Sequence, residues 1–136
     1  SLGQYDIGTY AMYRSTVRPF EVQTRLWQCG SVSCSCGMAV RENNDVIIID
    51  VCNGPYGLAK PEVIIKTSHP LAEGTRITRN GGSSSPTFNI HFPSGSKVDV
   101  ITTTTGMDIT IHVPSDDFQN CEGLCGNFDL VHSEAW

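Results

Sequence analysis

The sequence predicts an all-β protein, a two-sheet antiparallel β-sandwich with disulfides. Apolar and polar residues alternate along residues 20–25, 88–92 and 109–113, which is the period of a strand with one face on a core. Glycine, proline and asparagine separate these runs at short intervals, and six cysteines fall into two clusters. Short strands joined by turns at this spacing are typical of a sandwich.

The individual strands are predicted in chain order. Phe20, Val22 and Thr24 share one face and polar residues share the other, so the first of these strands is expected to have one solvated face. Residues 46–51 are largely β-branched and apolar on both faces up to Asp50, which predicts a strand near the middle of a sheet. Three more antiparallel strands are expected around residues 88–92, 98–100 and 109–113. Turns are expected at residues 43–45, 53–55, 80–82, 93–95 and 105–106.

Length and composition indicate one small acidic domain. The 136 residues carry a net charge of −5, and no block of lysine or arginine gives a footprint for nucleic acid or for an anionic membrane. The longest apolar run, residues 46–49, is far shorter than the roughly 20 residues that span a bilayer, so no membrane insertion is expected. The chain starts at Ser1 without a signal sequence, and we expect it to be a mature or excised piece of a longer protein.

The cysteines are expected to form disulfides in an oxidising compartment, because an even number in a small domain suggests a disulfide framework. Cys36 and Cys52 are symmetric about Asn44, so a hairpin with that register would place them opposite each other. Cys29 and Cys34 would close a small loop. Cys121 and Cys125 either pair with each other or reach cysteines outside the chain.

Two other uses of the cysteines are disfavoured by their spacing. Four thiolates could in principle bind zinc, but Cys34 and Cys36 are too close together for the usual zinc knuckle. Cys121 and Cys125 are separated by three residues, whereas the thioredoxin-type redox motif has two.

Catalytic signatures are not found in the sequence, which has no nucleophile elbow, phosphate-binding glycine loop or zinc-protease helix motif. The acidic pair Asp116 and Asp117 is expected in a solvated loop, since adjacent side chains diverge in an extended chain. His91 and His112 fall on presumed polar strand faces and are expected to be solvated. A non-enzymatic role follows.

The segment Gly123-Leu124-Cys125-Gly126-Asn127-Phe128-Asp129, preceded by Cys121, resembles the signature that closes the von Willebrand factor type D domain. Residues 8–13 and 20–22, and the cysteines at 29 and 34, also resemble that domain, so the resemblance covers nearly the whole chain. Residues 1–136 would then be a single type D-like domain, truncated at both ends relative to the family.

The resemblance implies a β-sandwich that binds calcium beside the closing signature and serves extracellular assembly or adhesion. By that resemblance Asn127 and Asp129 are calcium-ligand candidates, and Glu134 could add a carboxylate, which agrees with the preference of calcium for oxygen ligands. Alternatively, Asn127 and Asp129 only shape a turn by bonding nearby backbone amides.

The expected function is therefore that of a secreted, non-enzymatic structural or adhesive module within a larger protein, stabilised by calcium. Its expected partners are other extracellular proteins, further copies of itself, or its own missing N-terminal segment. The alternative is a sandwich that binds a small ligand or a carbohydrate, with Trp27, Tyr56 and Trp136 as stacking surfaces.

Overall fold

The computed structural model describes residues 8–53, 60–67, 70–82, 85–103, 105–117, 121–123 and 131–132. The described elements are strands apart from one 3₁₀ helix, η1. They are β1 (Gly8–Ser15), β2 (Phe20–Cys29), β3 (Val32–Glu42), β4 (Asp45–Asp50), β5 (Glu62–Ile65), β6 (Arg76–Asn80), β7 (Thr87–His91), β8 (Lys97–Thr102), β9 (Met107–His112), η1 (Ser115–Asp117), β10 (Cys121–Gly123) and β11 (Val131–His132). No helix in this part of the chain is long and apolar enough to cross a membrane.

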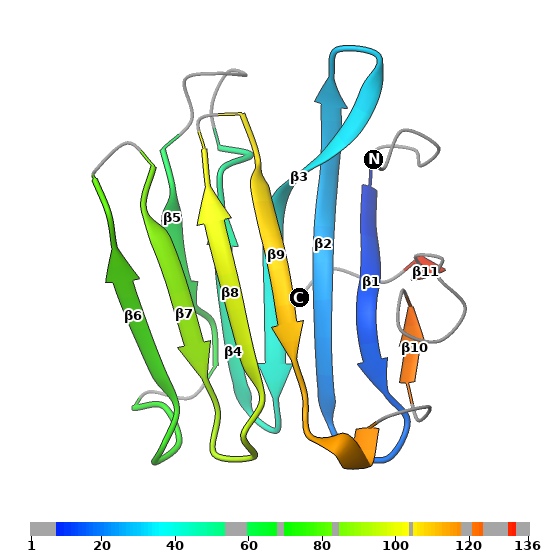
Figure 1. The fold of residues 1–136 in the computed structure, drawn as a ribbon, viewed down its shortest axis with the longest axis vertical. Coiled ribbons are helices and arrows are strands. Elements are labelled where there is room, and N and C mark those ends of the chain that lie inside the picture. The colour runs from blue at the N-terminus through cyan, green and yellow to red at the C-terminus, as the bar shows by residue number, and fades with distance from the viewer. Residues whose placement is uncertain are drawn as a thin grey trace.

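The strands form two antiparallel sheets, as the sequence predicts. The longer sheet has the order β10-β1-β2-β3-β4-β5, with β11 also paired to β1, and the shorter sheet has the order β6-β7-β8-β9. In Figure 1 the shorter sheet lies in front of β4 and β5, whereas β1, β2 and β10 lie to one side of it. The two sheets therefore overlap only in part, and β9 contacts β3 at the boundary.

The core lies between the sheets and uses the alternating residues. Phe20 and Val22 of the longer sheet and Phe88 and Ile90 of the shorter one are at most 1% exposed. The ring of Phe20 also meets that of Phe92 edge to face, at 5.9 Å between centroids, a favourable arrangement for aromatic rings. The predicted strand at residues 46–51 is β4, which has β3 and β5 as neighbours, so its internal position is confirmed.

The second face of β2 is solvated at Arg25 but buried at Glu21 and Gln23, which corrects the prediction for those two residues. Glu21 and Gln23 are only 9% and 3% exposed, although they lie opposite the core face. A Gln23 Nε2–H donates to Glu21 Oε2 at 3.1 Å, and Arg14 forms an ion pair with the same oxygen at 3.3 Å. Polar side chains can be buried in this way when they satisfy one another's hydrogen bonds.

The structure contains the disulfides Cys29–Cys34 and Cys36–Cys52, with Cα atoms 5.9 and 5.1 Å apart. Both are the pairs expected from the sequence, but the hairpin register differs by one residue. Glu42 lies opposite Asp45, so Cys36 faces Val51, whose N–H donates to its carbonyl at 2.7 Å. The turn is tighter than expected because Asn43 adopts a left-handed conformation with φ 55°, which asparagine tolerates.

Candidate functional site

The predicted calcium ligands Asn127, Asp129 and Glu134 lie outside the described residues, as do Cys125, Tyr56 and Trp136. The strands on both sides of the closing segment are described. Gly123 of β10 lies opposite Tyr13, and Val131 of β11 lies opposite Ala11, so both strands pair with β1. They also lie beside β1 in Figure 1.

The point of β1 between these two pairings is irregular. The register of β1 against β2 shifts between Ala11 and Tyr13, which makes Met12 an extra residue. The strands on the two sides of residues 124–130 thus pair with β1 next to its bulge. Cys121 lies opposite Ser15 and is disulfide-bonded. Its predicted partner is outside the described residues. Within the described part of the chain, no group of three or more His, Cys, Asp or Glu side chains could hold a metal ion.

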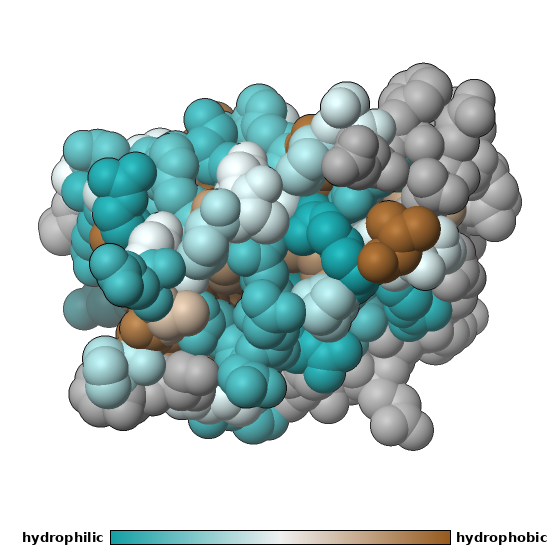
Figure 2. Space-filling view, turned by 90° about the horizontal axis from the view of Figure 1, so that it is seen from below, coloured by the Kyte–Doolittle hydropathy of each residue, from teal (hydrophilic) through white to brown (hydrophobic). Residues whose placement is uncertain are grey.

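A buried polar network fixes the chain just before β10. The carboxylate of Asp117 in η1 accepts hydrogen bonds from Arg18 Nε at 2.9 Å, from Arg18 Nη2 at 2.8 Å and from the Tyr13 hydroxyl at 2.6 Å. Arg18 Nη1 also donates to Glu42 at 3.1 Å, and its Nη2 donates to Ser96 at 2.6 Å. The network therefore joins the β1–β2 corner to η1, to the end of β3 and to the β7–β8 loop. Figure 2, which looks at this end of the molecule, shows a mainly hydrophilic surface.

Charge and burial in this network shift two ionisation equilibria. Hydrogen bonds from Arg18 lower the pKa of Asp117, although burial opposes them, and the Tyr13 hydroxyl and the charge of Arg18 lower it further. Burial raises the pKa of Tyr13 well above its usual range, and the hydrogen bond and charge of Asp117 add to that rise. The arrangement holds a carboxylate and a neutral phenol, so it is suited to anchoring the chain.

The burial of Asp117 corrects the expectation of a solvated acidic loop. Its side chain is fully buried, whereas Ser115, at the start of η1, is exposed. Its partners lie about a hundred residues earlier in the sequence, so no local pattern could have revealed the contact. The sequence did offer one signal of this contact. Arg18 is the only charged residue within residues 15–20, where the other side chains are small or apolar.

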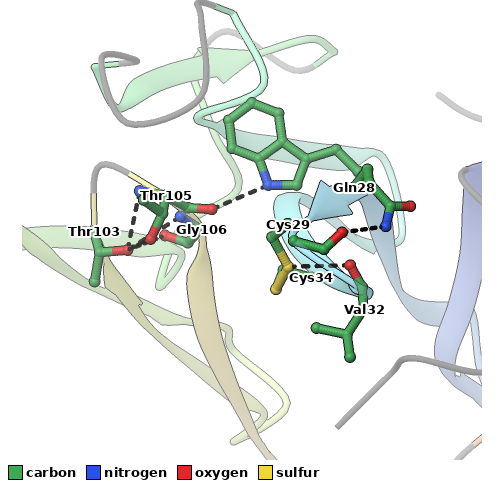
Figure 3. Close-up of a disulfide and its surroundings, with 9 residues drawn as sticks. Gln28, Cys29, Val32, Cys34, Thr103, Thr105 and Gly106 are labelled. Carbon is green, nitrogen blue, oxygen red and sulfur yellow. Dashed lines mark hydrogen bonds between the residues drawn. A yellow bond between two sulfur atoms is a disulfide. The ribbon is translucent and has the colours of Figure 1, made fainter.

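The opposite end of the sandwich is closed by Trp27. The indole Nε1–H donates to the carbonyl of Thr105 at 3.0 Å, beside the Cys29–Cys34 disulfide (Figure 3). The Gly106 N–H donates to Thr103 Oγ1 at 3.1 Å, which closes the turn that presents this carbonyl. Trp27 also packs against the core. It is a partly buried packing residue, so only part of its ring is left for the expected stacking surface.

Two surface hollows accompany these features. One, of about 390 Å³, lies between the disulfide hairpin and the start of β9 and is lined by Ser33, Cys34 and Met107 among others. The other, of about 220 Å³, lies on the outer face of the longer sheet over Gly37. A Cβ atom at Gly37 would come within 3.1 Å of Asp50 Oδ1, which already accepts the Cys52 N–H at 2.9 Å. The glycine thus leaves room for the second disulfide and its supporting carboxylate.

Another polar cluster, separate from the Asp117 network, lies on the outer face of the shorter sheet. Asp99 accepts a hydrogen bond from the Asn89 amide at 2.5 Å and contacts Lys97 Nζ at 3.5 Å and His112 Nε2 at 3.1 Å. Burial raises the pKa of Asp99, but the Asn89 hydrogen bond and the two basic neighbours outweigh it and lower the pKa overall. Asp99 is therefore a carboxylate over the whole neutral range.

No model of a known protein family matches this chain.

Proposed function

We propose that the chain is a non-enzymatic, extracellular β-sandwich module that supports assembly or protein–protein interaction within a larger protein. The observation that carries the proposal is the state of the cysteines: all five that the structure describes are disulfide-bonded. Disulfides persist in oxidising compartments and are rare in the cytosol. The polar groups at the two ends of the sandwich form hydrogen bonds that hold loops together, which supports a structural role.

The family we propose is the von Willebrand factor type D domain, and the proposal rests on the segment from Gly123 to Asp129. The strands β10 and β11 attach both flanks of this segment to β1. The Asp117 network fixes the chain four residues before Cys121. A segment held in this way is suited to present several oxygen ligands to calcium, since a turn can bring carboxylates, amides and carbonyls together.

The oxidising origin is tested by the intact mass of the denatured, unreduced protein from its natural source, with and without thiol alkylation. We expect no alkylation. Uptake of alkylating reagent at all cysteines would overturn the extracellular assignment.

Calcium binding is tested separately by the thermal unfolding midpoint in calcium, in magnesium and with a chelator. Calcium is expected to raise the midpoint of the wild type, because a ligand that binds only the folded state stabilises it. The Asp129→Ala variant should lose this shift, whereas a matched change at exposed Asp108 should keep it. An equal calcium response in both variants would contradict the assigned site and leave the disulfide result intact.

A further inference from the structure

Four basic side chains from four strands form one row across the outer face of the shorter sheet. The register places Arg76 of β6 opposite His91 of β7, His91 opposite Lys97 of β8, and Lys97 opposite His112 of β9. Neighbours of these residues, such as Ile90, point to the core on the other face. Figure 1 looks onto the face that carries the row.

The row is long and mostly open to solvent, although His91 is only partly exposed. Three interstrand spacings of about 4.8 Å give it a length of roughly 14 Å. The side chain of His112 is 51% exposed, that of Lys97 is 34% exposed, and Arg76 is also exposed. The register places the side chains in a line, so they fit an extended ligand better than a compact one.

The charge of the row depends on its two histidines. With neutral imidazoles, Arg76 and Lys97 are partly offset by Asp99, which contacts Lys97 and His112. With both imidazoles protonated, the excess rises from one positive charge to three. The other carboxylates described near this face are exposed Asp108, which lies opposite Ile101 two rows away, and exposed Glu73, in the turn before β6.

We propose that this basic row binds a linear sulfated polysaccharide, and that protonation of His91 and His112 strengthens the binding. Charge complementarity identifies the ligand, because sulfate groups remain anionic at all relevant pH values and repeat along an extended chain. The protein carries a net charge of −5, so a local line of positive charge is the feature that such a polymer can distinguish. The site does not involve the calcium candidates or the disulfides.

The direction of the pH dependence follows from the chemistry of imidazole. Protonation of an imidazole adds a positive charge as the pH falls, whereas sulfate does not change. The pKa of Asp99 is lowered by its neighbours, so Asp99 stays ionised and does not cancel the effect by titrating. Two additional exposed ion pairs of ordinary strength correspond to an affinity increase on the order of threefold to tenfold.

The test is retention of the folded protein on immobilised heparin in a salt gradient at pH 7.5 and pH 5.5. Wild type is expected to elute at clearly higher salt at pH 5.5. The double variant His91→Gln, His112→Gln should lose most of this difference, and Lys97→Gln should elute earlier at both pH values. Lys66→Gln, an exposed lysine that follows β5 in the other sheet, is the matched control and should behave as wild type.

The proposal would be overturned by no retention at pH 5.5, by a pH response that survives in the double-histidine variant, by a loss of retention in Lys66→Gln equal to that in Lys97→Gln, or by equal retention on desulfated heparin. Equal retention on single-stranded RNA would assign the row to polyanions in general and reject a sulfated polysaccharide as its ligand. None of these results bears on the intact mass, so a failure here is distinguishable from a failure of the proposed extracellular module.

Discussion

Replacing Asp117 with asparagine is expected to lower the free energy of unfolding by about 2–4 kcal/mol. The variant keeps the shape of the side chain. It removes the negative charge of the carboxylate that accepts hydrogen bonds from two Arg18 nitrogens and from the Tyr13 hydroxyl. Loss of one partner from a fully buried ion pair costs about 3–5 kcal/mol. We expect less here, because the Arg18 side chain is 20% exposed and keeps Glu42 at 3.1 Å.

The assay is urea unfolding of the disulfide-intact protein at pH 7, followed by circular dichroism and tryptophan fluorescence. Exposed Asp108 provides the matched control, since Asp108→Asn makes the same chemical change and should alter stability by less than about 0.5 kcal/mol. Tyr13→Phe completes a double-mutant cycle, and a coupling of about 1 kcal/mol with Asp117 is expected from their hydrogen bond. A loss below about 0.5 kcal/mol in Asp117→Asn, with an unchanged denaturant slope, would refute the anchoring role.

The stability that Asp117 contributes should depend on pH, and the direction of this dependence follows from its pKa. Hydrogen bonds from Arg18 lower the pKa of Asp117 in the folded state, against the opposing effect of burial. The stability that it contributes is therefore fully present above the unfolded-state pKa of about 3.9 and is lost as the pH falls through the lower folded pKa. The difference between wild type and Asp117→Asn should be constant above about pH 5 and should shrink below about pH 4.

Further substitutions test the turn at Gly106 and the two disulfides. Gly106→Ala would place a Cβ 2.8 Å from the Ser35 carbonyl oxygen, so we expect a loss of about 1–3 kcal/mol by urea unfolding, whereas Gly82→Ala meets nothing within 4 Å and should change stability little. Alanine replacement of both cysteines should cost about 3 kcal/mol for Cys36–Cys52 and about 2 kcal/mol for Cys29–Cys34, because the longer loop restricts the unfolded chain more. The reverse order in urea unfolding would contradict that reasoning.

The strands were predictable because their signal is local. Alternation with period two identified the core residues of β2 and β7 and the residues of β9 that pack against the core, Ile109 and Ile111, and a β-branched apolar run identified β4. The symmetric spacing of Cys36 and Cys52 found the right partners even though the true register is one residue shorter. A disulfide tolerates that error, since its two side chains can bridge positions that are not directly opposite.

The polar sites were not predictable because their partners are distant in the sequence. Arg18 and Asp117 are separated by 99 positions, and only the closed sandwich brings them together. The basic row is hidden for the same reason: Arg76, Lys97 and the two histidines are spread over four strands, so the sequence shows no basic block. Composition argued correctly that the chain has no run of positive charge, but the register determines which charges share a face.

Directional polar contacts at the rim explain how the two sheets keep one relative arrangement. The apolar core favours contact between the sheets but does not fix their relative angle, because the hydrophobic effect is non-directional. Contacts between the sheets that supply direction include those of Arg18 with Ser96, of Trp27 with Thr105, and of Asp45 with the Thr75 hydroxyl at 2.7 Å. They lie at both ends of the molecule, so sliding or rotation of one sheet over the other would break hydrogen bonds at either end. The outer face that carries the basic row and the strand β1, which pairs with β10 and β11, are therefore held in one fixed arrangement.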